Sequence, residues 1–81
     1  MALELINRQN WTFRGAYPMC VIIKVIDKSS KLVKKGGKLI LEINFDQVNK
    51  VKKLLKKKGF YTNRVIKDLG KKNRCIVSTK L

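Results

Sequence analysis

The chain has 81 residues, enough for one small domain, and its 20 Lys and Arg against 5 Asp and Glu give a net charge of +15. Hydrophobic residues make up 44% of the chain, which excludes a disordered basic tail, because such tails are poorer in apolar residues. The absence of histidine excludes histidine-based acid–base catalysis and histidine-ligated metal sites.

Residues 1–19 are predicted to form a poorly defined arm ahead of a domain that spans residues 20–81. Three aromatic residues alternate loosely with polar ones here: Trp11, Phe13 and Tyr17. Gly15 and Pro18 interrupt any regular element. Arg8 and Arg14 lie beside the aromatic residues, a combination that can stack on nucleic-acid bases. A loosely packed arm is the simpler interpretation.

A helix is predicted over residues 20–35, although the β-branched start of this segment also fits a strand. Four apolar residues and one serine fall at helical spacing and predict the buried stripe: Ile22, Ile23, Ile26, Ser30 and Val33. Gly36 and Gly37 supply a stop, and the helix dipole favours Lys34 and Lys35 in the last turn.

Residues 38–44 are predicted to form a strand. Its apolar residues fall on both faces, which is typical of a central strand covered on both sides in a parallel sheet. Glu42 interrupts the apolar run. This carboxylate either pairs with a lysine at the strand end, or it lies at the carboxyl edge of the sheet, where ligands bind.

A second helix is predicted over residues 46–58. Asp46 is the expected N-cap, with a contribution of about 1 kcal/mol, and Gly59 ends the helix. Four apolar residues predict the buried stripe: Val48, Val51, Leu54 and Leu55. Lysines cover most of the remaining helix surface. This apolar stripe is too narrow to favour a helix that lies on a membrane surface.

Residues 60–67 and 74–80 are predicted to be two strands of a hairpin joined by the polar turn 68–73. The order helix, strand, helix, strand, strand indicates an α/β sheet. Three strands and two helices barely cover a strand that is apolar on both faces. We therefore expect part of a larger doubly wound sheet, with an exposed edge on the 38–44 strand that pairs with a partner chain or favours self-association.

Two cysteines and the lack of a signal peptide indicate a cytoplasmic protein. Cys20 and Cys75 are too far apart for a paired zinc motif. We expect both to be reduced, packed thiols rather than a disulfide. The longest apolar run, Met19 to Ile23, is far shorter than the roughly 18 residues of a membrane span.

The stretch 36–47, Gly-Gly-Lys-Leu-Ile-Leu-Glu-Ile-Asn-Phe-Asp-Gln, resembles the C-terminal part of the peptide chain release factor glutamine methyltransferases. The resemblance continues through Gly59-Phe60, then Lys67-Asp68-Leu69 and Arg74, and it covers about residues 21–80. The ordered set is its most specific feature, with Glu42, Gln47, Asp68 and Arg74 at the family spacing. The resemblance implies the C-terminal portion of a Rossmann-like class I methyltransferase sheet whose last strand is antiparallel. It also implies transfer of a methyl group from S-adenosylmethionine to a glutamine of release factors, which would be the partners.

The departures from the family matter as much as the match. The chain has no Gly-x-Gly cofactor loop, and its single proline, Pro18, excludes the Asn-Pro-Pro-Tyr substrate motif. Asn44 stands where the family has a glycine, and asparagine tolerates the left-handed backbone of such a turn. We therefore expect no catalytic, cofactor-binding or metal-binding residues and no S-adenosylmethionine binding by this chain alone, although the full-length family uses that cofactor.

The alternative function is a small basic nucleic-acid-binding module. The charge of +15 and the six lysines between Lys50 and Lys58 favour weak electrostatic binding to phosphate. Against it, lysines are spread along the chain and outnumber arginines sixteen to four, whereas bidentate phosphate and base recognition prefers arginine.

Overall fold

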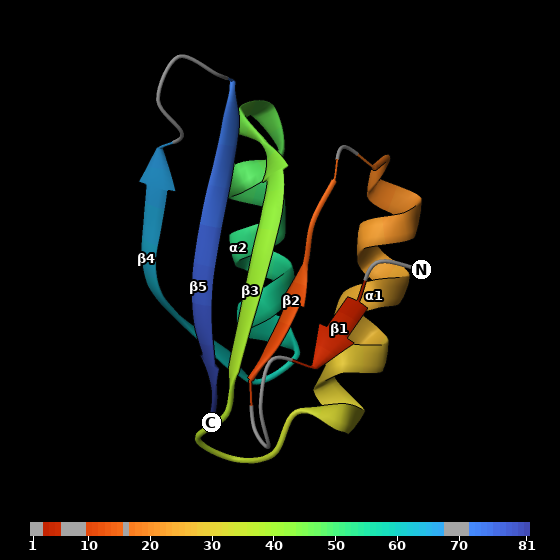
Figure 1. Ribbon diagram of the computed structural model, residues 1–81, viewed down its shortest axis with the longest axis vertical. Coiled ribbons are helices and arrows are strands. Elements are labelled where there is room, and N and C mark those ends of the chain that lie inside the picture. The colour runs from red at the N-terminus through yellow and green to blue at the C-terminus, as the bar shows by residue number, and fades with distance from the viewer. Residues whose placement is uncertain (1–2, 6–9, 16, 68–71) are drawn as a thin grey trace.

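A computed structural model describes residues 3–5, 10–15, 17–67 and 72–81 (Figure 1). In chain order the elements are β1 (Leu3–Leu5), β2 (Trp11–Phe13), α1 (Met19–Leu32), β3 (Lys38–Asn44), the 3-10 turn η1 (Phe45–Gln47), α2 (Val48–Lys57), β4 (Phe60–Lys67) and β5 (Asn73–Lys80). From α1 onward this is the predicted order of helices and strands. Most of the predicted hairpin turn, including Asp68, lies outside the described residues.

The strands within the described ranges form one sheet in the order β1-β2-β3-β5-β4. β2 runs parallel to β3, whereas β5 lies antiparallel to both β3 and β4, as predicted for the last strand. The prediction of three strands was wrong, because the N-terminal arm contributes β1 and β2. A strand of three residues is too short to reveal its alternation in the sequence.

The arm is also better packed than predicted. Trp11 and Phe13 of β2 lie in register with Leu39 and Leu41 of β3, and the Phe13 side chain is completely buried. Because β2 and β5 flank β3, the 38–44 strand has no exposed edge, contrary to expectation. The edges of the described sheet are β1 and β4.

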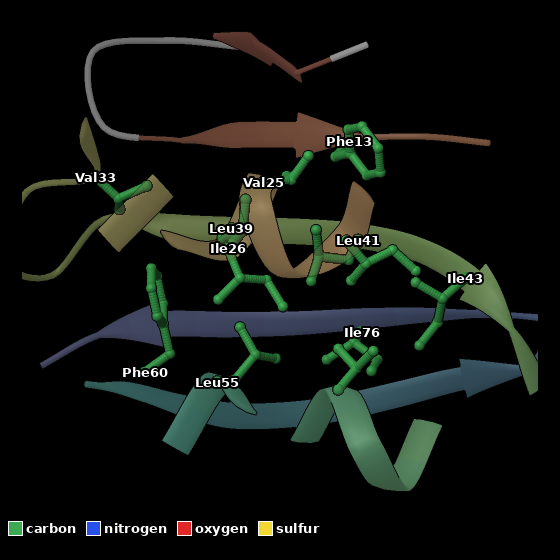
Figure 2. Close-up of a cluster of buried hydrophobic side chains, with 12 residues drawn as sticks. Phe13, Val25, Ile26, Val33, Leu39, Leu41, Ile43, Leu55, Phe60 and Ile76 are labelled. Carbon is green, nitrogen blue, oxygen red and sulfur yellow. The ribbon is translucent and has the colours of Figure 1, made fainter. Parts of the chain in front are cut away.

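Both helices pack on the same face of the sheet, and the hydrophobic core lies between them and the strands (Figures 1 and 2). The core draws on both helices and on β2, β3, β4 and β5, with these buried residues: Phe13, Ile22, Val25, Ile26, Val33, Leu39, Leu41, Ile43, Val51, Leu55, Phe60 and Ile76. The opposite side of the sheet, here called the open face, carries no helix of the described residues.

The inward stripe of α1 is the predicted one in part. Ile22, Ile26 and Val33 are buried as predicted, but Val25 and Ser29 are buried in place of Ser30 and of Ile23, which is 45% exposed. Ser29 avoids an unpaired hydroxyl in the core because its Oγ donates a 2.7 Å hydrogen bond to the Val25 carbonyl, one helical turn earlier. The helix also ends at Leu32. Lys34 and Lys35 therefore lie beyond the last turn, where the prediction had placed them inside it.

Side chains alternate along β3, so one face of the strand is buried and the opposite face is partly exposed. Leu39, Leu41 and Ile43 are buried against the helices, and the intervening residues Ile40 and Glu42 face the open side. The prediction of a strand covered on both sides was therefore wrong within the described residues. An apolar run alone does not reveal whether the second face has a covering layer.

The turn between β3 and α2 is organised by Asn44 and Gln47, not by Asp46. The Asn44 N–H donates a 3.1 Å hydrogen bond to Gln47 Oε1 as one half of a capping box around η1. Asp46 lies exposed within η1, so its predicted role as the cap was wrong. Asn44 has extended backbone (φ −69°), so the left-handed conformation expected for it is not adopted.

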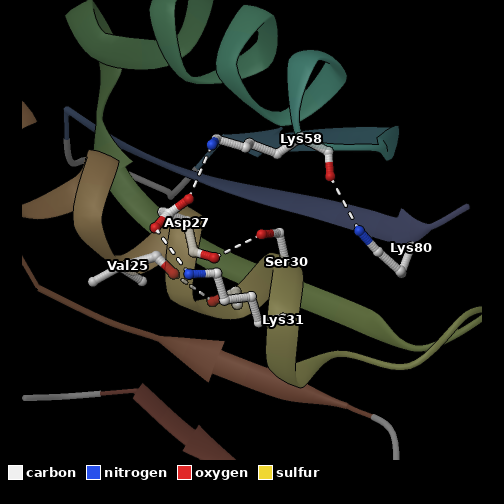
Figure 3. Close-up of polar contacts among 7 residues, drawn as sticks. Val25, Asp27, Ser30, Lys31, Lys58 and Lys80 are labelled. Carbon is white, nitrogen blue, oxygen red and sulfur yellow. Dashed lines mark hydrogen bonds and ion pairs between the residues drawn. The ribbon is translucent and has the colours of Figure 1, made fainter.

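An ion pair links the two helices on their outer side (Figure 3). Lys58 Nζ, just after α2, donates a 2.9 Å hydrogen bond to Asp27 Oδ1 in α1, and Lys31 Nζ lies 3.8 Å from Asp27 Oδ2. The hydrogen bond from Lys58, followed by the charges of Lys58 and Lys31, lowers the pKa of Asp27 below its usual value of 3.8.

Candidate binding pocket on the open sheet face

The open face contains a cavity of about 280 Å³ near the carboxyl ends of the parallel strands β2 and β3. It is lined by residues of four strands and by the residue after β2: Thr12, Arg14, Ile40, Glu42, Ile66, Lys67, Asn73, Arg74 and Cys75. In open α/β sheets this edge is where ligands usually bind. The cavity is therefore the candidate site.

Strand register explains why residues so far apart in sequence share this site. Thr12 of β2 lies beside Ile40 of β3, and Cys75 of β5 lies between Glu42 of β3 and Ile66 of β4. Side chains alternate between faces along a strand, and the neighbours of these residues, such as Leu41 and Ile76, point into the core. The same alternation that builds the core builds the cavity on its reverse.

Four charged residues line the cavity: Arg14, Lys67, Arg74 and Glu42. Glu42 shares the open face with Cys75 and Ile66, whereas Arg74 is in register with the buried Ile43 and with Lys67, so Arg74 and Lys67 lie on the core side of their strands and border the cavity from the sheet edge. The guanidinium of Arg74 lies 5.9 Å from the centre of the Phe45 ring and donates a 3.0 Å hydrogen bond to the Asn73 carbonyl, which holds this cation in place. The open face thus offers the Glu42 carboxylate as an acceptor beside the apolar Ile40 and Ile66, with Arg14 at the end of β2.

Two positions were expected for Glu42, in a pair with a lysine or at the carboxyl edge of the sheet, and the structure favours the carboxyl edge. The side chain is half-buried in the cavity wall, and no ion pair to it is formed by any residue that the structure describes. A half-buried carboxylate that lacks a lysine partner remains open to a ligand or to another polypeptide.

Gln47 joins the end of β3 to the segment that leads into α1. Its Oε1 accepts the bond from Asn44 at the end of β3, and its Nε2 donates a 2.9 Å hydrogen bond to the Tyr17 carbonyl after β2. The Tyr17 ring in turn packs on Phe13, with centroids 4.9 Å apart. Gln47 therefore ties the end of β3 to the residue before the Pro18 N-cap of α1, and nothing in its sequence neighbourhood indicated this tie to Tyr17.

Other sequence predictions about sites have simpler outcomes. Cys20 is exposed on α1 and was wrongly predicted to be packed, whereas Cys75 is half-buried in the cavity wall. Thr12 and Arg14 were assigned to a loose arm, yet both line the cavity. Of the helices in the described ranges, none has the length and hydropathy needed to cross a membrane.

The charges that line the cavity are not specific for S-adenosylmethionine. Glu42 would attract its sulfonium and ammonium groups and Arg14 its carboxylate, as they would for any zwitterionic ligand. The cavity is also lined by no glycine, so no backbone can approach a ligand as closely as a Gly-rich loop allows.

Comparison with known proteins gives a likeness in fold. No family model matches the chain, and no curated protein does. Among solved structures, the chain is similar to the crystal structure of a ribosomal protein L11 methylase from Lactobacillus delbrueckii subsp. bulgaricus, with a TM-score of 0.69 and 11% sequence identity. The match covers 90% of this chain and 38% of the methylase chain.

The fold is thus that of part of a methyltransferase. The chain forms a mixed α/β sheet layered with helices that matches a portion of a class I methyltransferase sheet, as the sequence predicted. It spans 38% of the length of the methylase it resembles.

Proposed function

We propose that the chain is the C-terminal part of an S-adenosylmethionine-dependent methyltransferase that modifies a glutamine side chain of peptide chain release factors. The observation that carries this proposal is the sheet order, in which antiparallel β5 lies between parallel β3 and β4, together with the fold likeness to a methylase. The glutamine specificity rests on the sequence alone, on the spacing of Glu42, Gln47 and Arg74.

The chain serves as a scaffold and does not catalyse methyl transfer alone. It lacks the Gly-rich loop and the Asn-Pro-Pro-Tyr motif of the family, and no glycine lines its cavity. Catalysis therefore requires a second polypeptide, or a further segment, that supplies both elements.

The open face is where this complement binds. Ile40 and Ile66 leave an apolar surface beside the half-buried Glu42, and the helices of the described residues lie on the other side. The second attachment point is the edge of β1, in place of the 38–44 edge expected from the sequence.

Reconstitution tests the proposal. The chain is mixed with the N-terminal portion of a release factor glutamine methyltransferase that ends before the strand equivalent to β2, and transfer of tritiated methyl groups from S-adenosylmethionine is measured. We expect transfer to a release factor when both polypeptides are present and none with either alone. Ribosomal protein L11 is the control substrate. Transfer to L11 instead of the release factor would contradict the glutamine specificity, and stoichiometric cofactor binding by the chain alone, measured by calorimetry, would contradict its scaffold role.

A further inference from the structure

The outer surface of α2 carries a stripe of three lysines that points away from the sheet. Val51 and Leu55 are the fully buried residues of this helix. Lys50, Lys53 and Lys57 follow one another at helical spacings of three and four, so they share the side opposite the buried pair. All three side chains are exposed. The helix therefore holds a line of cations in a defined direction.

Residues 47–67 include neither Asp nor Glu, and the nearest acid in sequence, Asp46 four residues before Lys50, is exposed and forms no ion pair within the described residues. The acid of the neighbouring helix, Asp27, is already paired with Lys58 and Lys31 (Figure 3). Five further exposed lysines lie on the same two helices: Lys24, Lys28, Lys31, Lys52 and Lys56. Both helices cover one face of the sheet (Figure 1). The lysines therefore contribute to one positive electrostatic potential on the helix side of the molecule.

We propose that the lysine stripe of α2 binds the phosphate backbone of a nucleic acid without reading its sequence. Lysine ammonium groups act as point charges for phosphate, whereas the bidentate arginines that read base edges are absent from α2. A membrane surface fits less well, because Val51 and Leu55 of α2 are buried and Val48 and Leu54 pack against the core, so no large apolar side of the helix faces outward. This binding is independent of methyl transfer and of the proposed complement on the open face.

The test compares two triple variants that remove the same charge. Fluorescence anisotropy measures binding of the full chain to a labelled 20-nucleotide single-stranded RNA over a series of salt concentrations. The first variant replaces Lys50, Lys53 and Lys57 with glutamine, which keeps good helix propensity. The control replaces Lys35, Arg64 and Lys72, three exposed residues outside the helices, with glutamine.

We expect the helix variant to bind at least about tenfold more weakly at low salt. Its plot of log affinity against log salt should be shallower by about 2, because each neutralised phosphate contributes about 0.7 for a single strand. The control variant should stay within about twofold of the unmodified chain. A third variant with arginine at the three stripe positions should retain binding, and circular dichroism should show all variants folded.

Three outcomes would overturn the proposal. Equal loss in the helix and control variants means that binding follows overall charge and has no site on α2. Absence of RNA binding by the unmodified chain at low salt removes the interaction itself. Binding to vesicles of anionic phospholipid without binding to RNA assigns the lysines to a membrane surface.

Discussion

Lys58 Nζ and Asp27 Oδ1 lie 2.9 Å apart and join the end of α2 to the middle of α1. They are the direct polar side-chain link between the two helices in the described residues. Asp27 is still 46% exposed, so solvent screens much of the attraction. The pair therefore orients the helices more than it stabilises them.

Stability should depend on pH through this pair. The folded pKa of Asp27 is lowered, so the stabilisation is fully present above the unfolded value of 3.8 and is lost as pH falls through the lower folded pKa. Replacing Asp27 with Asn should lower the melting temperature at neutral pH, and the difference from the unmodified chain should vanish in strong acid. Thermal melts over a pH series measure this, with Asp46→Asn as the exposed control. A difference that persists unchanged in acid would show that Asp27 acts by packing and not by charge.

Gln47→Ala should destabilise the chain by about 1–2 kcal/mol, because two side-chain hydrogen bonds that join the end of β3 to the segment before α1 are lost. Urea denaturation measures the change. The matched control is Asp46→Ala, one residue earlier, which we expect to change stability by less than about 0.5 kcal/mol. If the two variants behaved alike, Gln47 would not be the residue that organises this turn.

The two faces of the sheet should respond differently to the same deletion of one methyl group. Ile76→Val removes a methyl from a fully buried side chain and should cost about 1 kcal/mol. Ile40→Val, on the half-exposed open face, should cost less than about 0.5 kcal/mol. Chemical denaturation compares the two variants. Equal losses would indicate that the open face is covered in the isolated chain, for instance by self-association.

Gly59→Ala should cost about 1 kcal/mol, because Gly59 ends α2 with a positive φ of 83° that alanine adopts poorly. The added methyl group meets only the flexible tip of Lys80, 3.3 Å away, so backbone conformation is the main cause. Lys57→Ala, two residues earlier and exposed, serves as the control with little expected effect. A neutral Gly59→Ala variant would argue against the left-handed conformation at this helix end.

The sequence predicted those elements that carry a strong local signal. The bounds of β3 were correct to the residue, and α2 and the β4–β5 hairpin followed from helical spacing, Gly59 and a polar turn. β2 was not predicted, because its three residues are stabilised by pairing with β3 and the local sequence does not indicate this contact. In α1 only Ile23 and Ser30 were wrongly predicted to be buried, because consecutive β-branched residues allow several stripes.

The candidate cavity could be predicted only in part. Glu42 stood out as a charge within an apolar strand, and its place at the carboxyl edge was one of two expectations. Arg14, Ile66 and Cys75 join it through the register of four strands, which the sequence does not encode locally. The release factor specificity and the cytoplasmic location remain predictions from the sequence.

The position of β5 between β3 and β4 also sets the order in which the sheet can assemble. β4 is made before β5, yet β4 pairs with β5 and with no other strand of the described sheet. During synthesis β4 must therefore wait, unpaired, until β5 has left the ribosome and inserted beside β3. Pairs such as Lys38 with Thr79 join residues from distant parts of the chain, so the closing step is entropically costly and slow. A nascent chain that stalls before β5 exposes both β3 and β4 as open strands, at the stage when chaperone binding or aggregation competes with folding.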